Sequence, residues 1–210
     1  NEQGVAEGVS PFNQGTHEYT RLMKTVALRE GIDKYGFDAA IGGARRDEER
    51  SRAKERVFSL RSADHRWDPK NQRPEIWNLY NGRLNPGENM RVFPLSNWTE
   101  MDVWAYIQRE RLEVPRIYFS HPRRCVRRGG QWLPVSDFVP PKPGEEVRDL
   151  IVRVRTIGDI MSTGCVESPA TTVADIITEI AAARVTERGS RADDKASEAA
   201  MEDRKKAGYF

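Results

Sequence analysis

The sequence predicts an α/β fold with a parallel sheet, and three consecutive patterns support that prediction. Residues 17–36 carry apolar side chains at the spacing of an amphipathic helix. A short apolar run without helical period, "FDAAIGG" at residues 37–43, is typical of a buried strand. The glycines that end this run open onto a strongly charged segment. A helix, a buried strand and a glycine-rich turn into another helix follow one another in α/β proteins.

The segments around this first strand have simple signals. Residues 1–15 are polar and rich in glycine, so we expect a loop there. Gly36 suits the left-handed position that ends many helices, and it should end the first helix. The charged residues after Gly43 are expected to form a second helix. Residues 61–89 contain many turn-forming groups, including Asn-Pro-Gly, and are expected to form a long loop.

The middle of the chain predicts a strand, a helix and a hairpin. The strand is expected at residues 91–95, "RVFPL". Thr99 followed three residues later by Asp102 is a capping-box pattern, which predicts the start of a helix whose Trp104 faces the core. Gly129 and its glycine neighbour then predict a hairpin turn.

The last third of the chain is less regular. Residues 148–158 fit either a strand or a helix. An amphipathic helix is expected over residues 172–185, with its inward face made by Val173, Ile176, Ile177 and Ile180. From Glu187 onward the sequence is almost all charge and alanine, so we expect a tail or a helix that lies on a partner.

Composition excludes several classes of protein. The chain has 210 residues and a net charge of +2 from 34 basic and 32 acidic residues, which argues against a nucleic-acid-binding protein. No apolar run approaches the roughly 20 residues of a membrane span. Cys125 and Cys165 are the two cysteines, which supports neither a disulfide scaffold nor a metal cluster and fits a reducing cytoplasm. His17, His65 and His121 lack the spacing of a metal site and are expected on the surface or in loops.

The turn at Gly42-Gly43-Ala44-Arg45-Arg46 is the candidate functional site. In open parallel sheets ligands bind beyond the carboxyl ends of strands, and glycines there allow close approach of phosphate. Paired arginines offer planar forks that match phosphate or sulfate oxygens. An alternative fits the residues equally well: a tight turn followed by a solvated charged helix. Asp47, Glu48 and Glu49 could reach a magnesium ion, or could cap the helix or form ion pairs with neighbouring arginines.

Four stretches together resemble one protein family. They are "KYGFDAAIGGARRDEERSRAKER", "HRWDPKNQRPEIWNLYNG", "RVFPLSNWTEMDVWAYI" and the terminal "AAMEDRKKAGYF". In this order they are similar to the small subunits of heterodimeric bacterial sulfate adenylyltransferases. The resemblance implies an adenine nucleotide alpha-hydrolase-like (PP-loop) α/β fold with a loop-rich helical C-terminal extension. It also implies the reaction of ATP with sulfate to give adenylyl sulfate and pyrophosphate.

The resemblance implies roles for particular residues and partners. Arg45, Arg46 and Arg52 would be catalytic, and the residues that bind substrate or nucleotide would be Gly42, Gly43, Asp47, Glu48 and Ser51. Mg²⁺ would accompany the β- and γ-phosphates of ATP, with no metal ligand assigned in the chain. The expected partner is a GTPase large subunit, and neither nucleic acid nor membrane is expected.

One family feature has no counterpart in this sequence, namely the Ser-x-Gly-Lys-Asp-Ser loop that cradles the phosphates. We therefore expect residues 1–115 to be the C-terminal portion of the nucleotide-binding domain, and residues 116–210 to be an extension that contacts the partner. A chain of this kind would be inactive alone. Two alternatives stay open: a sulfonucleotide reductase, which the absence of a cysteine after Cys165 disfavours, and a chain that only docks the GTPase.

Overall fold

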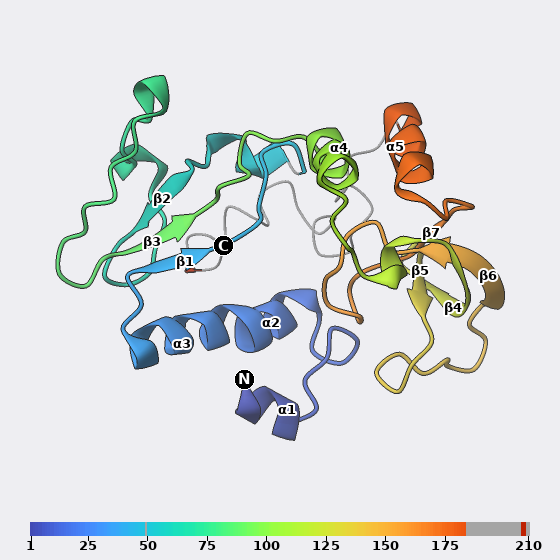
Figure 1. The fold of residues 1–210 in the computed structure, drawn as a ribbon. Coiled ribbons are helices and arrows are strands. Elements are labelled where there is room, and N and C mark those ends of the chain that lie inside the picture. Colours follow the sequence, from blue (N-terminus) through green and yellow to red (C-terminus); the bar gives the residue numbers. More distant parts are fainter. Residues whose placement is uncertain (49, 184–206, 209–210) are drawn as a thin grey trace. The chain divides into compact units, whose positions relative to one another are not determined.

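The computed structural model describes residues 1–48, 50–183 and 207–208, without the side chains of residues 50 and 51. The chain divides into two compact units (Figure 1). The N-terminal unit holds residues 1–97 with residues 207 and 208, and the C-terminal unit begins at Trp98. The compact units thus divide between Asn97 and Trp98, whereas the domain boundary expected from the sequence lies after residue 115. The expected tail helix beyond Glu187 falls outside the described residues, except for positions 207 and 208.

The N-terminal unit begins with a short helix where a loop was expected. Helix α1 spans Glu2–Ala6. The Asn1 side chain accepts a hydrogen bond from the Gly4 backbone N–H at 2.9 Å and so caps the helix. The expectation of a loop over residues 1–15 was therefore wrong for its first part, because this cap signal was overlooked.

A long helical stretch follows and confirms the first predicted helix. It consists of α2 (Thr16–Thr20), a π-helical turn (Arg21–Val26) and α3 (Ala27–Tyr35). Gly36 ends it with a left-handed backbone, at a φ of 62°.

A three-stranded sheet lies beyond this helix. Strand β1 (Ala39–Ile41) runs parallel to β3 (Asn89–Val92), and β2 (Phe58–Arg61) pairs with the other side of β3 in the antiparallel direction. The parallel pair confirms the α/β prediction for this unit. Strand β2 was not expected, and β3 begins two residues earlier than the strand predicted at residues 91–95.

The charged segment after Gly43 is not the helix that the sequence predicted. It forms a turn and then a short 3₁₀ helix over Arg50–Lys54. The reason is the position of β2, because residues from Phe58 onward pair with β3. The segment therefore only connects the end of β1 to the start of β2, the two outer strands of the same sheet. The expected loop over residues 61–89 holds two further 3₁₀ turns, Pro69–Asn71 and Ile76–Asn78.

The C-terminal unit packs helices beside an antiparallel sheet of order β5-β4-β6-β7. Strands β4 (His121–Arg128) and β5 (Gln131–Pro134) form the predicted hairpin. The ambiguous segment is strand β6 (Val147–Arg153), because it pairs along β4, and β7 (Val166–Glu167) completes the sheet.

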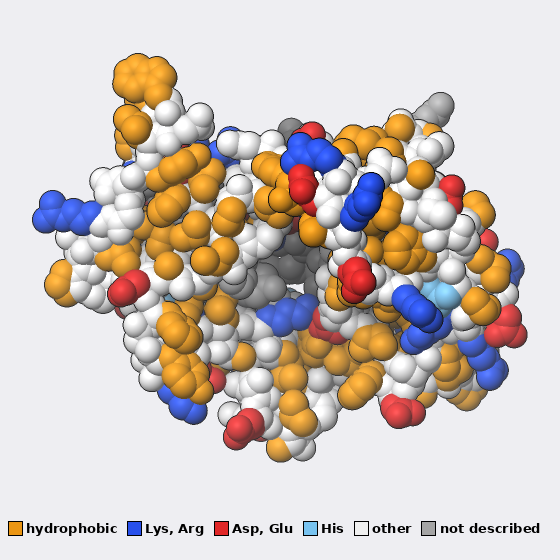
Figure 2. Space-filling view, in the orientation of Figure 1, with side chains coloured by type: hydrophobic (Ala, Val, Ile, Leu, Met, Phe, Trp, Pro, Cys, Tyr) orange, Lys and Arg blue, Asp and Glu red, His pale blue; other side chains and the backbone are white. Residues whose placement is uncertain are grey.

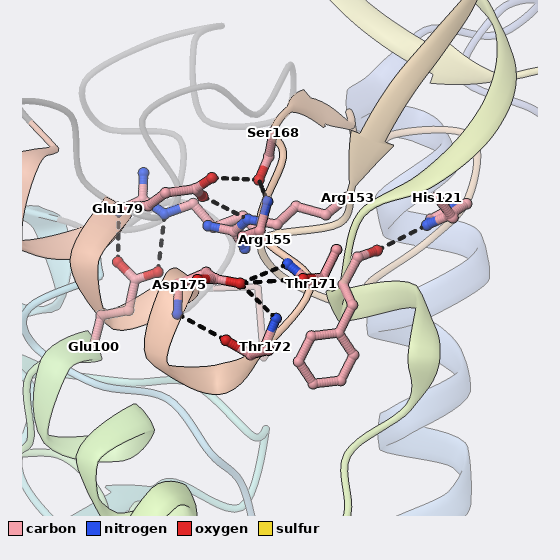
Figure 3. Close-up of polar contacts among 11 residues, drawn as sticks. Glu100, His121, Arg153, Arg155, Ser168, Thr171, Thr172, Asp175 and Glu179 are labelled. Atoms are coloured by element: carbon pink, nitrogen blue, oxygen red, sulfur yellow. Dashed lines mark hydrogen bonds and ion pairs between the residues drawn. The ribbon is translucent and has the colours of Figure 1, made fainter.

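Both helices predicted for this unit are present. Helix α4 spans Glu100–Glu110 and α5 spans Val173–Ala182, and a short 3₁₀ turn lies at Arg116–Tyr118. Trp104 and Ile176 are buried in one cluster, and Val173, Ile177 and Ile180 pack against it as expected. Ion pairs add to this packing: Arg153 contacts Glu179 on α5 at 2.9 Å, and Arg155 contacts Glu100 on α4 at 2.5 Å (Figure 3).

His65 lies in a loop, as expected, but its side chain is buried, with only 4% of it exposed. Its Nε2 lies 2.8 Å from the Asp33 carboxylate and its Nδ1 lies 2.8 Å from the Asn89 amide nitrogen. These two partners explain its burial, because each ring nitrogen has a hydrogen-bonding group.

Within the described ranges, no helix combines the length and the apolar character that crossing a membrane requires.

Candidate active site

The segments that carry the candidate residues meet at one end of the N-terminal sheet, where β1 and β3 finish; this end is called the sheet edge. Ile41, Val92 and Phe58 stand side by side in the last row of the ladder. Strands β1 and β3 are parallel, so both end at this edge. Strand β2 is antiparallel to β3, so it begins there. The turn after β1, the segment after β3 and the residues before β2 therefore converge, beyond the carboxyl ends of the parallel pair.

Backbone hydrogen bonds hold these three segments together. The Gly42 N–H donates to the Val92 carbonyl at 2.9 Å, and the Arg46 N–H donates to the Ser96 carbonyl at 3.0 Å. On the other side of β3, the Phe93 N–H donates to Val57 at 2.8 Å. Gly43 is exposed, and a Cβ added there would meet no atom within 4 Å. The described packing does not require a glycine at this position, because the space that a Cβ atom would occupy is empty.

A pocket of about 410 Å³ lies within the N-terminal unit and is lined at this edge by residues from all three segments and from the loop after β2. Its polar lining consists of Arg46, Arg56, Glu75, Asn78, Tyr80 and Asn97. The Nε atoms of Arg46 and Arg56 are both buried without a hydrogen-bond partner. Among the residues that the structure describes, neither guanidinium group has an ion pair. Two positive charges are thus held at the pocket.

The other two predicted arginines are buried, and Arg52 belongs to a charged cluster. Arg52 is 4% exposed, and its Nε lies 2.8 Å from Glu48. Its NH1 lies 3.5 Å from Glu55, which in turn lies 3.6 Å from Arg61. These contacts bring opposite charges together without good hydrogen-bond geometry, since the nitrogens concerned have no hydrogen-bond partner. Arg45 is 7% exposed and is also engaged by other groups.

Burial shifts the pKa values of two arginines in and beside this cluster. It lowers the pKa of Arg61 to about 10, against the opposing attraction of Glu55. Burial likewise lowers the pKa of Arg91, on the neighbouring strand, to about 10. Both groups stay protonated at neutral pH, so the sheet carries buried positive charge close to the candidate site.

The remaining predicted residues differ in their exposure and in their contacts. Gly42 is half-buried in the turn, and Asp47 is exposed. The Glu48 carboxylate contacts Arg52, as the ion-pair alternative predicted. The side chain of Ser51 lies outside the described part of the structure, as does Glu49.

The loop after β2 forms the outer wall of the pocket because two of its side chains form hydrogen bonds with the side of β2 that does not pair with β3. Both oxygens of Glu75 accept backbone N–H groups, from Val57 at 3.0 Å and from Phe58 at 2.7 Å. Gln72 accepts from the Leu60 N–H at 2.9 Å and donates to its carbonyl at 3.1 Å. The two side chains satisfy an edge strand that would otherwise be unpaired.

Comparisons with known proteins identify the family. Residues 1–165 match the family model of the phosphoadenosine phosphosulfate reductase domain. A protein named sulfate adenylyltransferase subunit 2 from Chelativorans sp. is 53% identical over 211 residues, which cover all of this chain and 70% of that relative. The protein of the same name from Magnetococcus marinus is 54% identical with the same coverage. This chain belongs to the sulfate adenylyltransferase subunit 2 family.

The identity confirms the resemblance seen in the four sequence stretches, and it extends over the whole chain. A sulfate adenylyltransferase subunit 2 from Streptomyces lavendulae is 59% identical over 189 residues, which are 90% of this chain and 59% of that relative. The chain thus spans about 70% of the length of the first two relatives. The match to the reductase-domain model agrees with the mixed α/β structure.

Among the polar residues that line the pocket, only Arg46 was predicted from the sequence; the others are Arg56, Glu75, Asn78, Tyr80 and Asn97. Arg56 was placed on a charged helix, whereas it precedes β2. The apolar residues Val57, Phe58 and Leu60 were the available signal for that strand, since Phe58 and Leu60 alternate with polar neighbours. Asn97 could have been found from the rule that ligands lie beyond the ends of parallel strands.

Proposed function

We propose that this chain is the catalytic subunit of a sulfate adenylyltransferase, which joins the adenylyl group of ATP to sulfate and releases pyrophosphate. The observation that carries this proposal is the identity of 53% over the entire chain to a relative of that name. The pocket at the sheet edge supports it, because two arginines without carboxylate partners suit anionic substrates.

The reaction needs positioning more than covalent catalysis. A sulfate oxygen attacks the α-phosphorus of ATP, and the bond from that phosphorus to the bridging oxygen of pyrophosphate breaks. All participants are anions, so arginines placed beside them reduce repulsion on approach and stabilise the charge of the five-coordinate phosphorus. We assign this role first to Arg46, which lines the pocket.

Arg45 and Arg52 keep a different status within the proposed site. Both are buried and have partners in the free protein. We propose that they reach the substrates only if the turn over residues 45–52 rearranges, and that otherwise they position Arg46 through the charged cluster. Gly42, Gly43, Asp47, Glu48 and Ser51 stay proposed nucleotide-binding residues of the same turn.

Mg²⁺ enters this proposal as part of the substrate, bound to the phosphates of ATP. In the described ranges, no three His, Cys, Asp or Glu side chains converge to hold a metal ion. Glu48 faces Arg52 instead, which makes it a poor metal ligand. We therefore assign the ion no site on these residues and no step in the reaction.

The partner and fold assignments follow from the same family. The name "subunit 2" of the relatives denotes one component of a multi-subunit enzyme, and we propose a GTPase large subunit as the other component here. We propose the adenine nucleotide alpha-hydrolase-like fold, with residues 1–115 as the C-terminal portion of its nucleotide-binding domain and the following residues as the partner-contacting extension. A cytoplasmic location fits the two unpaired thiols.

The reductase alternative is less favoured by the chemistry of those thiols. Cys125 and Cys165 are both buried within the C-terminal unit, at 0% and 7% exposure. The hydrogen bond with Cys125, together with burial, raises the pKa of the Cys165 thiol. A protonated thiol is a poor nucleophile, and the Cys125 thiol, whose pKa the same hydrogen bond lowers, is fully buried.

The test is sulfate-dependent release of pyrophosphate by the full-length chain assembled with its other subunit. Arg46→Ala should lower the rate about a hundredfold, in the range seen when one transition-state donor is removed. Arg45→Ala and Arg52→Ala should be compared in the same assay, with circular dichroism as a check of folding. A wild-type rate in all three variants would refute the assignment of these arginines.

A further inference from the structure

We infer that Arg46 and Arg56 together form a binding site for a tetrahedral oxyanion, and that Arg56 is a substrate-binding residue of this protein. The inference rests on the proposed function, since the oxyanion is either sulfate or a phosphate group of the nucleotide. It assigns a role to Arg56, to which the sequence analysis gave none, and it separates the two arginines that line the pocket from the buried Arg45 and Arg52.

The topology of the sheet explains why these two arginines meet. Arg46 follows β1 in the turn that is tied to Ser96, and Arg56 stands two residues before the first residue of β2. Because β2 is antiparallel to β3, its beginning lies at the edge where β1 and β3 end. Two positions ten residues apart thus line one pocket, together with Asn97 after β3.

Ion pairing distinguishes these two arginines from the neighbouring Arg52 and Arg61. Arg52 and Arg61 contact Glu55, and Arg52 also contacts Glu48. Arg46 and Arg56 have no such carboxylate partner in the described part of the chain. An oxyanion in the pocket would supply the counter-charge that these two guanidinium groups lack.

The carboxylate of Glu75 also lines the pocket and offsets one of its two positive charges, so the lining keeps a net charge of +1. Both of its oxygens accept backbone N–H groups of Val57 and Phe58, at 3.0 and 2.7 Å. This leaves two guanidinium groups and the amides of Asn78 and Asn97 as donors at the pocket. Such a donor-rich lining is complementary to a ligand that has acceptor oxygens on every side, as sulfate and phosphate groups do.

The wall of the pocket is under backbone strain. Trp77 and Asn78 have φ values of 55° and 58°, in the left-handed region that non-glycine residues rarely adopt. Trp77 is 86% exposed, so burial of its ring does not explain this conformation. Hydrophobic side chains project at the tip of this loop, at the upper left of Figure 2. The strain places Asn78 at the pocket, and strained residues of this kind cluster at ligand sites.

The test is Arg56→Gln in the full-length chain assembled with its other subunit, with separate KM values for sulfate and for Mg-ATP. Losing one charged hydrogen-bonding group should raise the KM for the anion that it holds about tenfold. Arg83→Gln is the matched control, because Arg83 is exposed and does not line the pocket. Arg56→Lys keeps the charge without the planar fork and should have an intermediate effect.

The outcomes separate the two sources of the oxyanion. An increased KM for sulfate assigns the pocket to sulfate, and an increased KM for Mg-ATP assigns it to a nucleotide phosphate; either result supports the inference. If both KM values of Arg56→Gln equal those of Arg83→Gln while thermal melting shows a folded protein, the inference is wrong. Failure of the wild-type enzyme to release pyrophosphate in response to sulfate would instead contradict the proposed function.

Discussion

His65 shows how one buried side chain can be fixed by its neighbours. The carboxylate of Asp33 can only accept, so His65 Nε2 must carry the proton of that hydrogen bond. Arg91 donates to the Asn89 oxygen at 2.7 Å, which turns the Asn89 NH₂ group toward His65 Nδ1. The Nδ1 atom must therefore accept, and the ring is held as the neutral Nε2–H tautomer.

This tautomer can be tested directly. In ¹⁵N NMR spectra at neutral pH, His65 should show a protonated Nε2 and an unprotonated Nδ1. Asn89→Asp replaces the NH₂ donor by an acceptor, so a proton should then appear on Nδ1. A proton on Nδ1 in the unmodified protein would contradict the orientation assigned to Asn89.

A surface ion pair in the C-terminal unit gives a prediction about pH. The Glu145 carboxylate accepts two hydrogen bonds from Arg128, at 2.6 and 2.7 Å, and one from the Lys142 backbone N–H at 2.7 Å. The bond with Arg128, followed by that with Lys142, lowers the pKa of Glu145 from 4.5 to about 2. The stabilisation is thus complete above pH 4.5 and is lost as the pH falls toward 2.

Thermal melting of Glu145→Gln should follow that pattern. The variant should melt below the wild type at pH 7, and the difference should disappear as the pH approaches 2. Glu113→Gln, at an exposed position without a comparable pair, is the control and should show little difference at any pH. A difference between wild type and Glu145→Gln that persisted unchanged at pH 2 would contradict the assigned pKa.

At the scale of elements, both long helices of the C-terminal unit begin with a capping box. In α5 the Thr172 hydroxyl accepts from the Asp175 N–H at 3.2 Å, and Asp175 accepts from the Thr172 N–H at 2.9 Å (Figure 3). Thr172→Ala should lower the free energy of unfolding by about 1 kcal/mol. Thr172→Ser keeps the hydroxyl and should change it little. Chemical denaturation measures both, and equal losses in the two variants would mean that the cap is not the cause.

The loop that covers the edge of β2 gives a second test at this scale. Glu75→Ala removes the acceptor of the Val57 and Phe58 N–H groups, so their hydrogen exchange should accelerate. The Leu60 N–H, held by Gln72, is an internal control and should keep its rate. Unchanged exchange at Val57 and Phe58 would show that Glu75 does not hold the loop against the strand.

For the whole molecule, local signals in the sequence predicted those elements that local residues determine. Gly36 ended a helix and Thr99 began one because both act within one turn. Strand β2 was missed because its alternation covers only four residues, a weak signal, and its pairing partner β3 lies about thirty residues away. The candidate site follows the same division. The turn with Arg46 was predictable from a strand followed by glycines, whereas Arg56 required the direction of β2, which pairing alone sets.

The division among the arginines was also beyond the sequence. Arg45, Arg46, Arg52 and Arg56 are chemically identical, and their spacing does not show which of them face carboxylates. Burial beside Glu48 and Glu55 sets Arg52 apart from Arg46 and Arg56. This difference arises from how the turn connects two strands of the sheet, so it becomes visible only in three dimensions.

The most direct test of the central claim is to incubate the full-length chain and its other subunit with Mg-ATP, GTP and radiolabelled sulfate, and to identify the labelled product. We expect adenylyl sulfate and pyrophosphate in equal amounts, with formation strongly reduced by Arg46→Ala. Label that stays in inorganic sulfate would contradict the account and would favour a chain that only docks its partner. In a second assay, labelled adenylyl sulfate and a reductant are supplied instead. Labelled sulfite there would contradict the account and would favour a reductase.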